Sequence, residues 1–271
     1  GDARALPHRV MAARGDVSPE DLRRFRDALA SVPAHQGRSE RLLRAVVSSW
    51  CRVVGWRLTV AGSDRLPSRD GVSGAGCIVA VAPHRAWVEP FLLVAAWPAE
   101  AARLVWLADG RAATRSWWRR RLLPRLGVIP IAAGAGGPRA YAEQAALAVE
   151  RGCAVVVFPE VGPPAPPART RALSPGFAYL ALRAGAPVLP VVVAGNHRLV
   201  RGSPLSVDFC AAIATGEAMA DPLTPPGRAR AERIRGELAE AMADVLPTRT
   251  AQADAAAPAR ARWRWLGSLF D

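Results

Sequence analysis

The chain has 271 residues, which is enough for one large α/β domain but short for two domains of ordinary size. Hydrophobic residues make up 51% of it, a content that excludes a disordered chain. Its 36 basic residues, all of them arginine, outnumber its 23 acidic residues and give a net charge of +13. Such a charge suits nucleic acid, an anionic membrane surface or phosphorylated small molecules. Since no nucleic-acid-binding motif is present, we expect no nucleic acid partner.

The four cysteines are far apart and lack the spacing of metal ligands, so we expect buried free thiols, a reducing compartment and no metal site. Residues 1–16 lack the apolar core of a signal peptide. No run of about 18 uncharged apolar residues could form a transmembrane helix. We therefore expect a protein that lies at the cytoplasmic, inner face of the membrane without crossing it.

The N-terminal part is predicted to be helical. After a flexible lead of residues 1–16, the sequence from Ser18 to Asp21 is typical of a helix start, and a second helix is predicted from Ser39 towards Val54. The apolar residues of the second helix share one side: Leu42, Leu43, Val46, Val47, Trp50 and Val54. Two interpretations stay open, a helix that packs on the core and an interfacial helix whose arginines meet lipid phosphates. A strand at 56–60 and a loop at 62–76 follow.

The next strand carries the first candidate for chemistry. An apolar run at 77–82 ends at Pro83 and places His84 at its tip, and Glu89 follows five residues later. A histidine can act as a general base near neutral pH when a carboxylate fixes its tautomer and ring angle. A lone histidine near an acid is often only structural, so this interpretation needs support from the rest of the chain.

A helix at 89–98 and a strand at 103–107 lead into the most biased segment, 110–142, which holds seven arginines and no acid. Trp117 and Trp118 lie within it. A solvated basic helix would leave both rings in water without reason. We therefore favour contact with a membrane or an acidic carrier protein.

Within the same region, a strand at 127–131, a glycine-rich loop at 132–137 and a helix at 138–151 are predicted. A loop before a helix N-terminus can hold a phosphate on its backbone N–H groups. The glycine spacing matches no nucleotide-binding motif, so this signal is weak.

The second half of the chain continues the alternation of strands and helices. An apolar strand at 153–158, predicted to be buried on both faces, precedes a proline-rich loop at 161–168. The remaining predicted elements are a helix at 175–184, strands at 188–193 and 205–209, an amphipathic helix at 228–245, a linker at 247–260 and a basic-aromatic tail at 260–270.

This order predicts an α/β fold with a central mixed, largely parallel sheet flanked by helices, an N-terminal helical pair and a C-terminal amphipathic helix. We divide the chain into an N-terminal part (1–55), the α/β domain (56–246) and a linker with tail (247–271). His84 and Glu160 each follow a strand, so they should share one edge of the sheet with the glycine-rich loop.

Four motifs occur in a characteristic order: His84 with Glu89 five residues on, Gly127-Val128-Ile129, Phe158-Pro159-Glu160, and Val188-Leu189-Pro190-Val191-Val192. In order and spacing they resemble the glycerolipid acyltransferases, the family typified by 1-acylglycerol-3-phosphate acyltransferase. The similarity runs from about Val53 to Gly195, roughly half of the chain.

The resemblance implies acyl transfer from acyl-CoA or an acyl carrier protein to a lysophospholipid-like hydroxyl, without a cofactor. It implies that His84 is the general base and that Glu89 orients it. It also implies that one set of residues forms the acceptor site: Phe158, Pro159 and Glu160, with charge from Arg139, Arg169 or Arg171.

Three departures from the family pattern bear on the acceptor. Glu89 stands where aspartate is usual, so its extra methylene must be absorbed by the turn. Residues 132–133 are alanines where the family has an arginine, and 161–163 and Ser174 replace further phosphate-binding residues. The open alternatives are the same chemistry on a glycolipid or specialised metabolite, and a non-catalytic lipid-binding relative. The presence of both His84 and Glu160 argues against the last.

Overall fold

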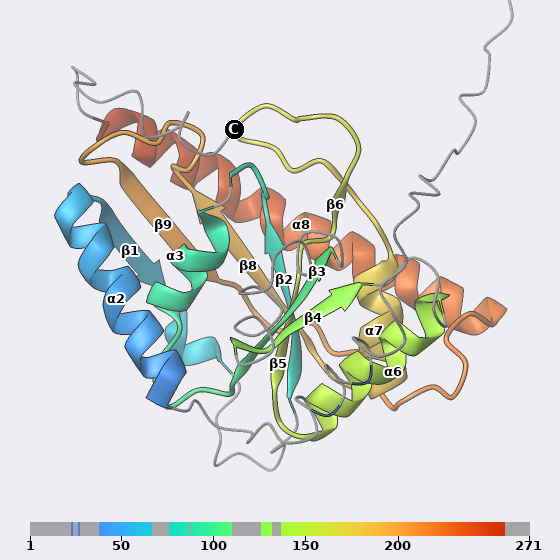
Figure 1. Cartoon of the computed structure of the whole chain (residues 1–271). Coiled ribbons are helices and arrows are strands. Elements are labelled where there is room, and N and C mark those ends of the chain that lie inside the picture. Colours follow the sequence, from blue (N-terminus) through green and yellow to red (C-terminus); the bar gives the residue numbers. More distant parts are fainter. Residues whose placement is uncertain are drawn as a thin grey trace, which may run out of the picture.

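The computed structural model describes residues 38–66, 76–86, 88–109, 126–131 and 137–257, together with Arg23 and Asp27. In these residues a central sheet lies between two groups of helices (Figure 1). The helices are α2 (Arg38–Val54), η1 (Ser63–Arg65, 3₁₀), α3 (Glu89–Ala96), α6 (Gly137–Glu150), α7 (Gly176–Ala184) and α8 (Pro225–Ala255). The strands are β1 (Arg57–Ala61), β2 (Cys77–Ala82), β3 (Leu104–Asp109), β4 (Val128–Ile131), β5 (Ala154–Val157), β6 (Glu160–Val161), β7 (Ala172–Leu173), β8 (Val188–Ala194) and β9 (Pro204–Phe209).

The main sheet has the strand order β1-β9-β8-β2-β5-β3-β4. The strands from β8 to β4 in this order run parallel, β9 pairs antiparallel with β8, and β1 pairs parallel with β9. The predicted mixed, largely parallel sheet is therefore confirmed. Because β8, β2 and β5 are parallel neighbours, their carboxyl ends meet at one edge, where polar residues that follow them can converge.

The sheet separates two hydrophobic cores. Even-numbered residues of β2 pack with α6, α7 and α8, whereas its odd-numbered residues pack with α2 and α3. Since both faces are covered, β2 and β5 are buried along their whole length. This confirms the prediction that the 153–158 segment is buried on both faces.

Helix α8 is longer than predicted. Thr224 caps its start by accepting a hydrogen bond from the Gly227 N–H, and the helix then continues through Pro247 to Ala255. The prediction of a linker from residue 247 is therefore wrong for residues 247–255, which are helical. The buried face of the helix continues past the proline, since Leu246 and Thr250 are both buried one turn apart. This packing outweighs the local cost of a proline inside a helix.

Helix α2 has one face in the core and a second, exposed apolar face. Val47 and Cys51 are buried in the core, which confirms a packing face. Leu42 and Val46 were expected on the same side as Val47, but they are 66% and 56% exposed, and Val53 is 76% exposed. They form an apolar stripe at helical spacing on the outer face, away from the core.

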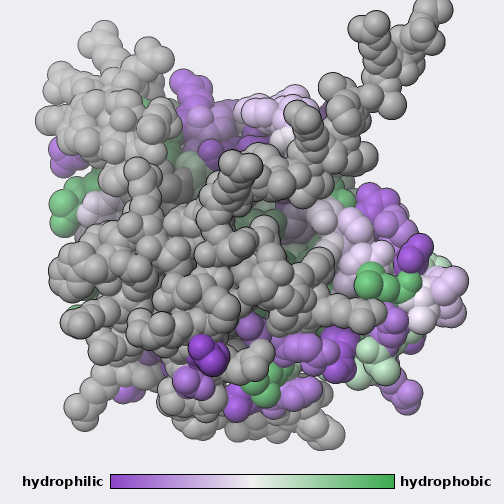
Figure 2. All heavy atoms as spheres, turned by 45° about the vertical axis from the view of Figure 1, so that its right-hand side comes forward, coloured by the Kyte–Doolittle hydropathy of each residue, from purple (hydrophilic) through white to green (hydrophobic). Residues whose placement is uncertain are grey.

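Figure 2 brings the side of α6 and α7 forward; the described residues there are mainly hydrophilic, with hydrophobic residues in smaller patches. Within the described ranges, no helix has the length and apolar character needed to cross a bilayer. Several predicted features lie outside these ranges: the helix at 18–32, the basic segment at 110–125, the glycine-rich loop at 132–136 and the tail at 260–270.

Candidate active site

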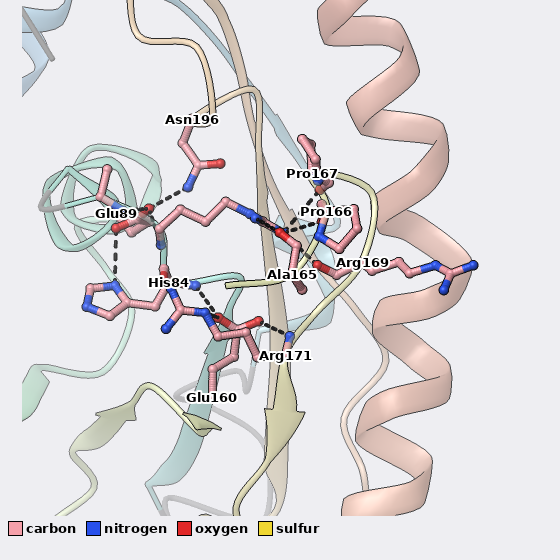
Figure 3. A network of polar contacts seen from close by, with 11 residues as sticks. His84, Glu89, Glu160, Ala165, Pro166, Pro167, Arg169, Arg171 and Asn196 are labelled. Atoms are coloured by element: carbon pink, nitrogen blue, oxygen red, sulfur yellow. Dashed lines mark hydrogen bonds and ion pairs between the residues drawn. The ribbon is translucent and has the colours of Figure 1, made fainter. Parts of the chain in front are cut away.

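The candidate site lies at the carboxyl edge of the sheet, where the chain leaves three neighbouring strands. His84 follows β2, Glu160 lies three residues after the end of β5 as the first residue of β6, and Asn196 follows β8. Figure 3 shows these side chains converging on one region. The edge position predicted for His84 and Glu160 is confirmed.

His84 and Glu89 form a direct pair. Nδ1 of the imidazole lies 3.2 Å from Oε2 of Glu89. The carboxylate is fully buried, whereas the His84 side chain is 44% exposed. When the imidazole donates its Nδ1 proton to the carboxylate, Nε2 carries the lone pair that can accept a proton. The pair therefore has the geometry of a base with an orienting carboxylate.

The turn before α3 accommodates the longer glutamate. Oε1 of Glu89 accepts hydrogen bonds from the backbone N–H groups of Arg85 at 3.0 Å and Ala86 at 2.7 Å. These bonds satisfy one carboxylate oxygen inside the turn and leave Oε2 to face His84. The glutamate thus stays within reach of the histidine in spite of its extra methylene.

Phe158 packs against the imidazole. Its ring centroid lies 4.2 Å from that of His84, with 31° between the ring planes. An offset contact of this kind restricts the ring of His84 on one side, while Glu89 holds it through Nδ1. Phe158 was predicted for the acceptor site, and the structure places it beside the candidate base.

Glu160 holds two loops together. Its Oε2 accepts the His84 backbone N–H at 2.8 Å, and its Oε1 accepts the Arg171 backbone N–H at 2.8 Å. Only 1% of its side chain is exposed, so the carboxylate is not open to a ligand in this structure. Pro159 is buried beside it, and its carbonyl accepts the Ser174 N–H at 2.8 Å.

The three predicted arginines differ in their placement. Arg171 lies in the site, where Nη2 donates to the His84 carbonyl at 3.2 Å and Nε lies 3.9 Å from Glu160. Arg169 is exposed, and its side chain points away from the imidazole (Figure 3). The side chain of Arg139 lies outside the described part of the structure.

Sequence reasoning missed Arg85. Its guanidinium donates to four carbonyl groups in residues 165–169, those of Ala165 at 2.7 Å, Pro166 at 2.7 Å, Pro167 at 3.4 Å and Arg169 at 2.6 Å. Burial lowers the pKa of this guanidinium, although Glu160 and Glu89 act in the opposite direction. A planar fork of donors is suited to bind several carbonyl groups at once. Arg85 therefore fixes the loop between β6 and β7 beside His84.

Asn196 was also missed. Its side-chain Nδ2 donates to Oε1 of Glu89, and both residues are buried. The available signal was its position, since it follows a buried parallel strand just as His84 and Glu160 do. The family resemblance seen in the sequence ends one residue earlier, at Gly195.

Fold and site together define an α/β protein with a histidine–carboxylate pair at the carboxyl edge of its sheet. A sequence model of the Acyltransferase family matches residues 57–194, half of the chain, and the chain belongs to this family. The family predicted from the four motifs is thereby confirmed, and acyl transfer is the class of activity that it defines.

Among solved structures, the chain is similar to the 1-acyl-sn-glycerophosphate (LPA) acyltransferase PlsC from Thermotoga maritima. The sequence identity is 18% and the TM-score is 0.49, over 74% of this chain and 79% of that chain. A comparison with curated proteins finds no match.

Proposed function

We propose that this protein transfers an acyl group from a thioester, acyl-CoA or acyl carrier protein, to a hydroxyl group of a lysophospholipid-like acceptor. The observation that carries the proposal is the contact between His84 Nδ1 and the buried carboxylate of Glu89. A thioester is already activated, whereas a hydroxyl is a poor nucleophile at neutral pH. A positioned base is therefore the main chemical requirement.

The reaction needs one proton carrier. His84 Nε2 takes the proton of the acceptor hydroxyl while the oxygen forms a bond to the thioester carbonyl carbon. The tetrahedral intermediate then collapses, its C–S bond breaks, and the departing thiolate receives the proton from the imidazolium. Glu89 stabilises the positive charge on the ring between these steps. No cofactor takes part in this scheme.

The placement of the arginines favours a second candidate acceptor. Arg171 is engaged with the His84 carbonyl and Glu160, and Arg169 points away from the imidazole. Neither is therefore held in this structure as a free phosphate-binding group beside His84. The same chemistry on a hydroxyl without a nearby phosphate, such as a glycolipid or a specialised metabolite, is the alternative.

The proposed function includes peripheral membrane binding, because a lipid acceptor is delivered from a membrane surface. The exposed apolar stripe of α2 and the net charge of +13 support it. Trp117 and Trp118, in the arginine-rich segment, add a second apolar and basic region in the sequence.

A substrate panel tests the proposal. Purified protein is incubated with acyl-CoA or acyl carrier protein and with lysophospholipids, neutral glycolipids and simple alcohols, and release of free thiol is followed. All four cysteines are free and buried, so the folded protein contributes little background to a thiol reagent. His84→Ala protein is the matched control. Acceptor-dependent thiol release that needs His84 is expected, and the preferred acceptor separates the two candidates. Lipid binding without any transfer would contradict the proposal and favour a non-catalytic role.

A further inference from the structure

Asn196 connects the histidine–carboxylate pair to a part of the chain far away in sequence. Its Nδ2 donates to Oε1 of Glu89 across 107 residues, and Asn196 is only 4% exposed. It lies two residues beyond the segment matched by the family model, 57–194. Figure 3 shows the amide above the carboxylate, on the side opposite His84.

The backbone on both sides of Asn196 is fixed. Gly195 has φ +84°, and a Cβ at this position would lie 2.1 Å from the Pro204 carbonyl oxygen, so only glycine fits there. On the other side, Nε2 of His197 lies 3.0 Å from Oδ1 of Asp254 in the last turns of α8. The amide is therefore presented from a short segment that is anchored to β9 and to α8.

Asn196 differs from the other donors that hold Glu89. The Arg85 and Ala86 N–H groups belong to the same turn as His84, so they move with the pair. Of the three donors to Oε1, only Asn196 comes from another strand end of the sheet. It occupies the oxygen that does not face His84, which leaves Oε2 directed at Nδ1. A glutamate has one more rotatable bond than aspartate. The hydrogen bond from Asn196 therefore restrains one more side-chain torsion of Glu89 than it would of an aspartate.

We infer that Asn196 is a positioning residue for the proposed acyl transfer, acting on the substrate only through Glu89. This inference rests on the proposed function of His84 and Glu89. The amide fixes the rotamer of the buried carboxylate and contributes a hydrogen bond to its charge. Removing it leaves Oε1 of Glu89 held only by the Arg85 and Ala86 N–H groups of its own turn, so the carboxylate is positioned less firmly against the imidazole; this lowers kcat and leaves KM for the acyl donor largely unchanged.

A double-mutant cycle tests the inference. We expect Asn196→Ala to lower kcat at least about 10-fold, if the hydrogen bond to the buried charge contributes to transition-state stabilisation what such bonds contribute to stability. In the Glu89→Gln background, the same replacement should lower kcat further by less than about 2-fold, because the charge that it positions is gone. Thr215→Val is the control for general destabilisation, since Thr215 is buried and its hydroxyl donates to Ala186 at 2.9 Å, outside the site. It should lower the unfolding temperature and leave kcat near the wild-type value.

A second variant gives a readout that a purely structural role would not move. Asn196→Asp keeps the size of the side chain but places a second carboxylate against Glu89. At neutral pH the two charges repel each other, while at lower pH a proton shared between them restores a donor to Glu89. The ratio of variant to wild-type kcat should therefore rise as the pH is lowered from 8 towards about 5.

The outcomes are separable. A kcat of Asn196→Ala within about 2-fold of wild type, or losses that multiply fully in the double variant, would overturn the role of Asn196 while leaving the His84–Glu89 mechanism intact. A silent Glu89→Gln would overturn the mechanism itself. If Asn196→Ala does not fold, the pH dependence of Asn196→Asp decides, and a ratio that stays constant with pH counts against the inference.

Discussion

The backbone N–H of His84 donates a 2.8 Å hydrogen bond to Oε2 of Glu160, which lies 76 residues further along the chain. This bond fixes the main chain of the candidate base, while Glu89 and Phe158 fix its ring. Backbone and side chain of His84 are thus held by separate groups. Replacing Glu160 therefore tests the support of the His84 backbone separately from the support of its ring.

Replacing Glu160 by glutamine should destabilise the protein and slow the reaction. The carboxylate accepts a backbone N–H with each oxygen, and an amide can accept only with one, so either His84 or Arg171 loses its partner. An unsatisfied buried donor costs about 1–3 kcal/mol. Thermal unfolding and kcat measure the two effects, with exposed Glu217→Gln as the matched control. A Glu160→Gln protein as stable and active as the control variant would show that this connection between the loops is dispensable.

The membrane proposal predicts salt-sensitive binding to anionic vesicles. Each arginine near an anionic surface contributes about 1 kcal/mol, an attraction that salt screens, whereas buried apolar side chains contribute a part that salt leaves. We expect sedimentation with anionic vesicles well above that with neutral ones, and release of most protein by added salt. Replacing Leu42, Val46 and Val53 by serine should weaken the vesicle binding that persists at high salt.

The control for this experiment is Leu223→Ser, because Leu223 is 42% exposed but lies before α8, outside α2. Equal binding of wild-type protein to neutral and anionic vesicles would contradict an electrostatic attraction to the membrane, and no binding to either would contradict membrane contact altogether. In that case the basic surface would serve a soluble acyl donor.

Stability should fall at alkaline pH because of the buried thiols. Burial raises the pKa of Cys77 from 9.0 to about 12 and that of Cys210 from 9.0 to about 11. The unfolded chain loses these protons near pH 9 while the folded chain keeps them, so the unfolded state binds fewer protons and stability decreases as pH rises from about 9 to 11.

Few other groups obscure this effect, since the chain has no lysine and only two tyrosines. The unfolding temperature measured between pH 7 and 11 tests it, and Cys77→Ala should reduce the dependence while Cys210 maintains part of it. An unfolding temperature that stays constant across this range, or thiols that react in the native protein, would contradict the burial of these groups.

The fold could be predicted from the sequence because most of its strands are local apolar runs that end near glycine or proline. The order of strands and helices then defines the α/β fold class. His84 and Glu89 lie five residues apart, so their pairing is a local property. Asn196 and Arg85 act over long separations, on Glu89 and on the loop at 165–169. No local pattern distinguishes a polar residue with such a partner from one exposed to solvent.

The errors have the same physical origin. The sequence predicts that the C-terminal helix ends at Val245 and that a linker begins at residue 247, whereas α8 continues through Pro247 because its turns pack on the core, which is a tertiary effect. The short pair of β6 and β7 was missed since each strand has two residues, too few for a periodic pattern. The orientation of Arg169 depends on a loop that Arg85 holds through its backbone, which spacing alone does not reveal.

The most direct test of the account is the rate of acceptor-dependent thiol release by His84→Ala, compared with wild type at saturating acyl donor. The side chain is 44% exposed, so its removal should leave the unfolding temperature nearly unchanged. Loss of the general base should lower kcat by about 10²–10⁴-fold. A folded His84→Ala protein that transfers acyl groups at the wild-type rate would contradict the central claim.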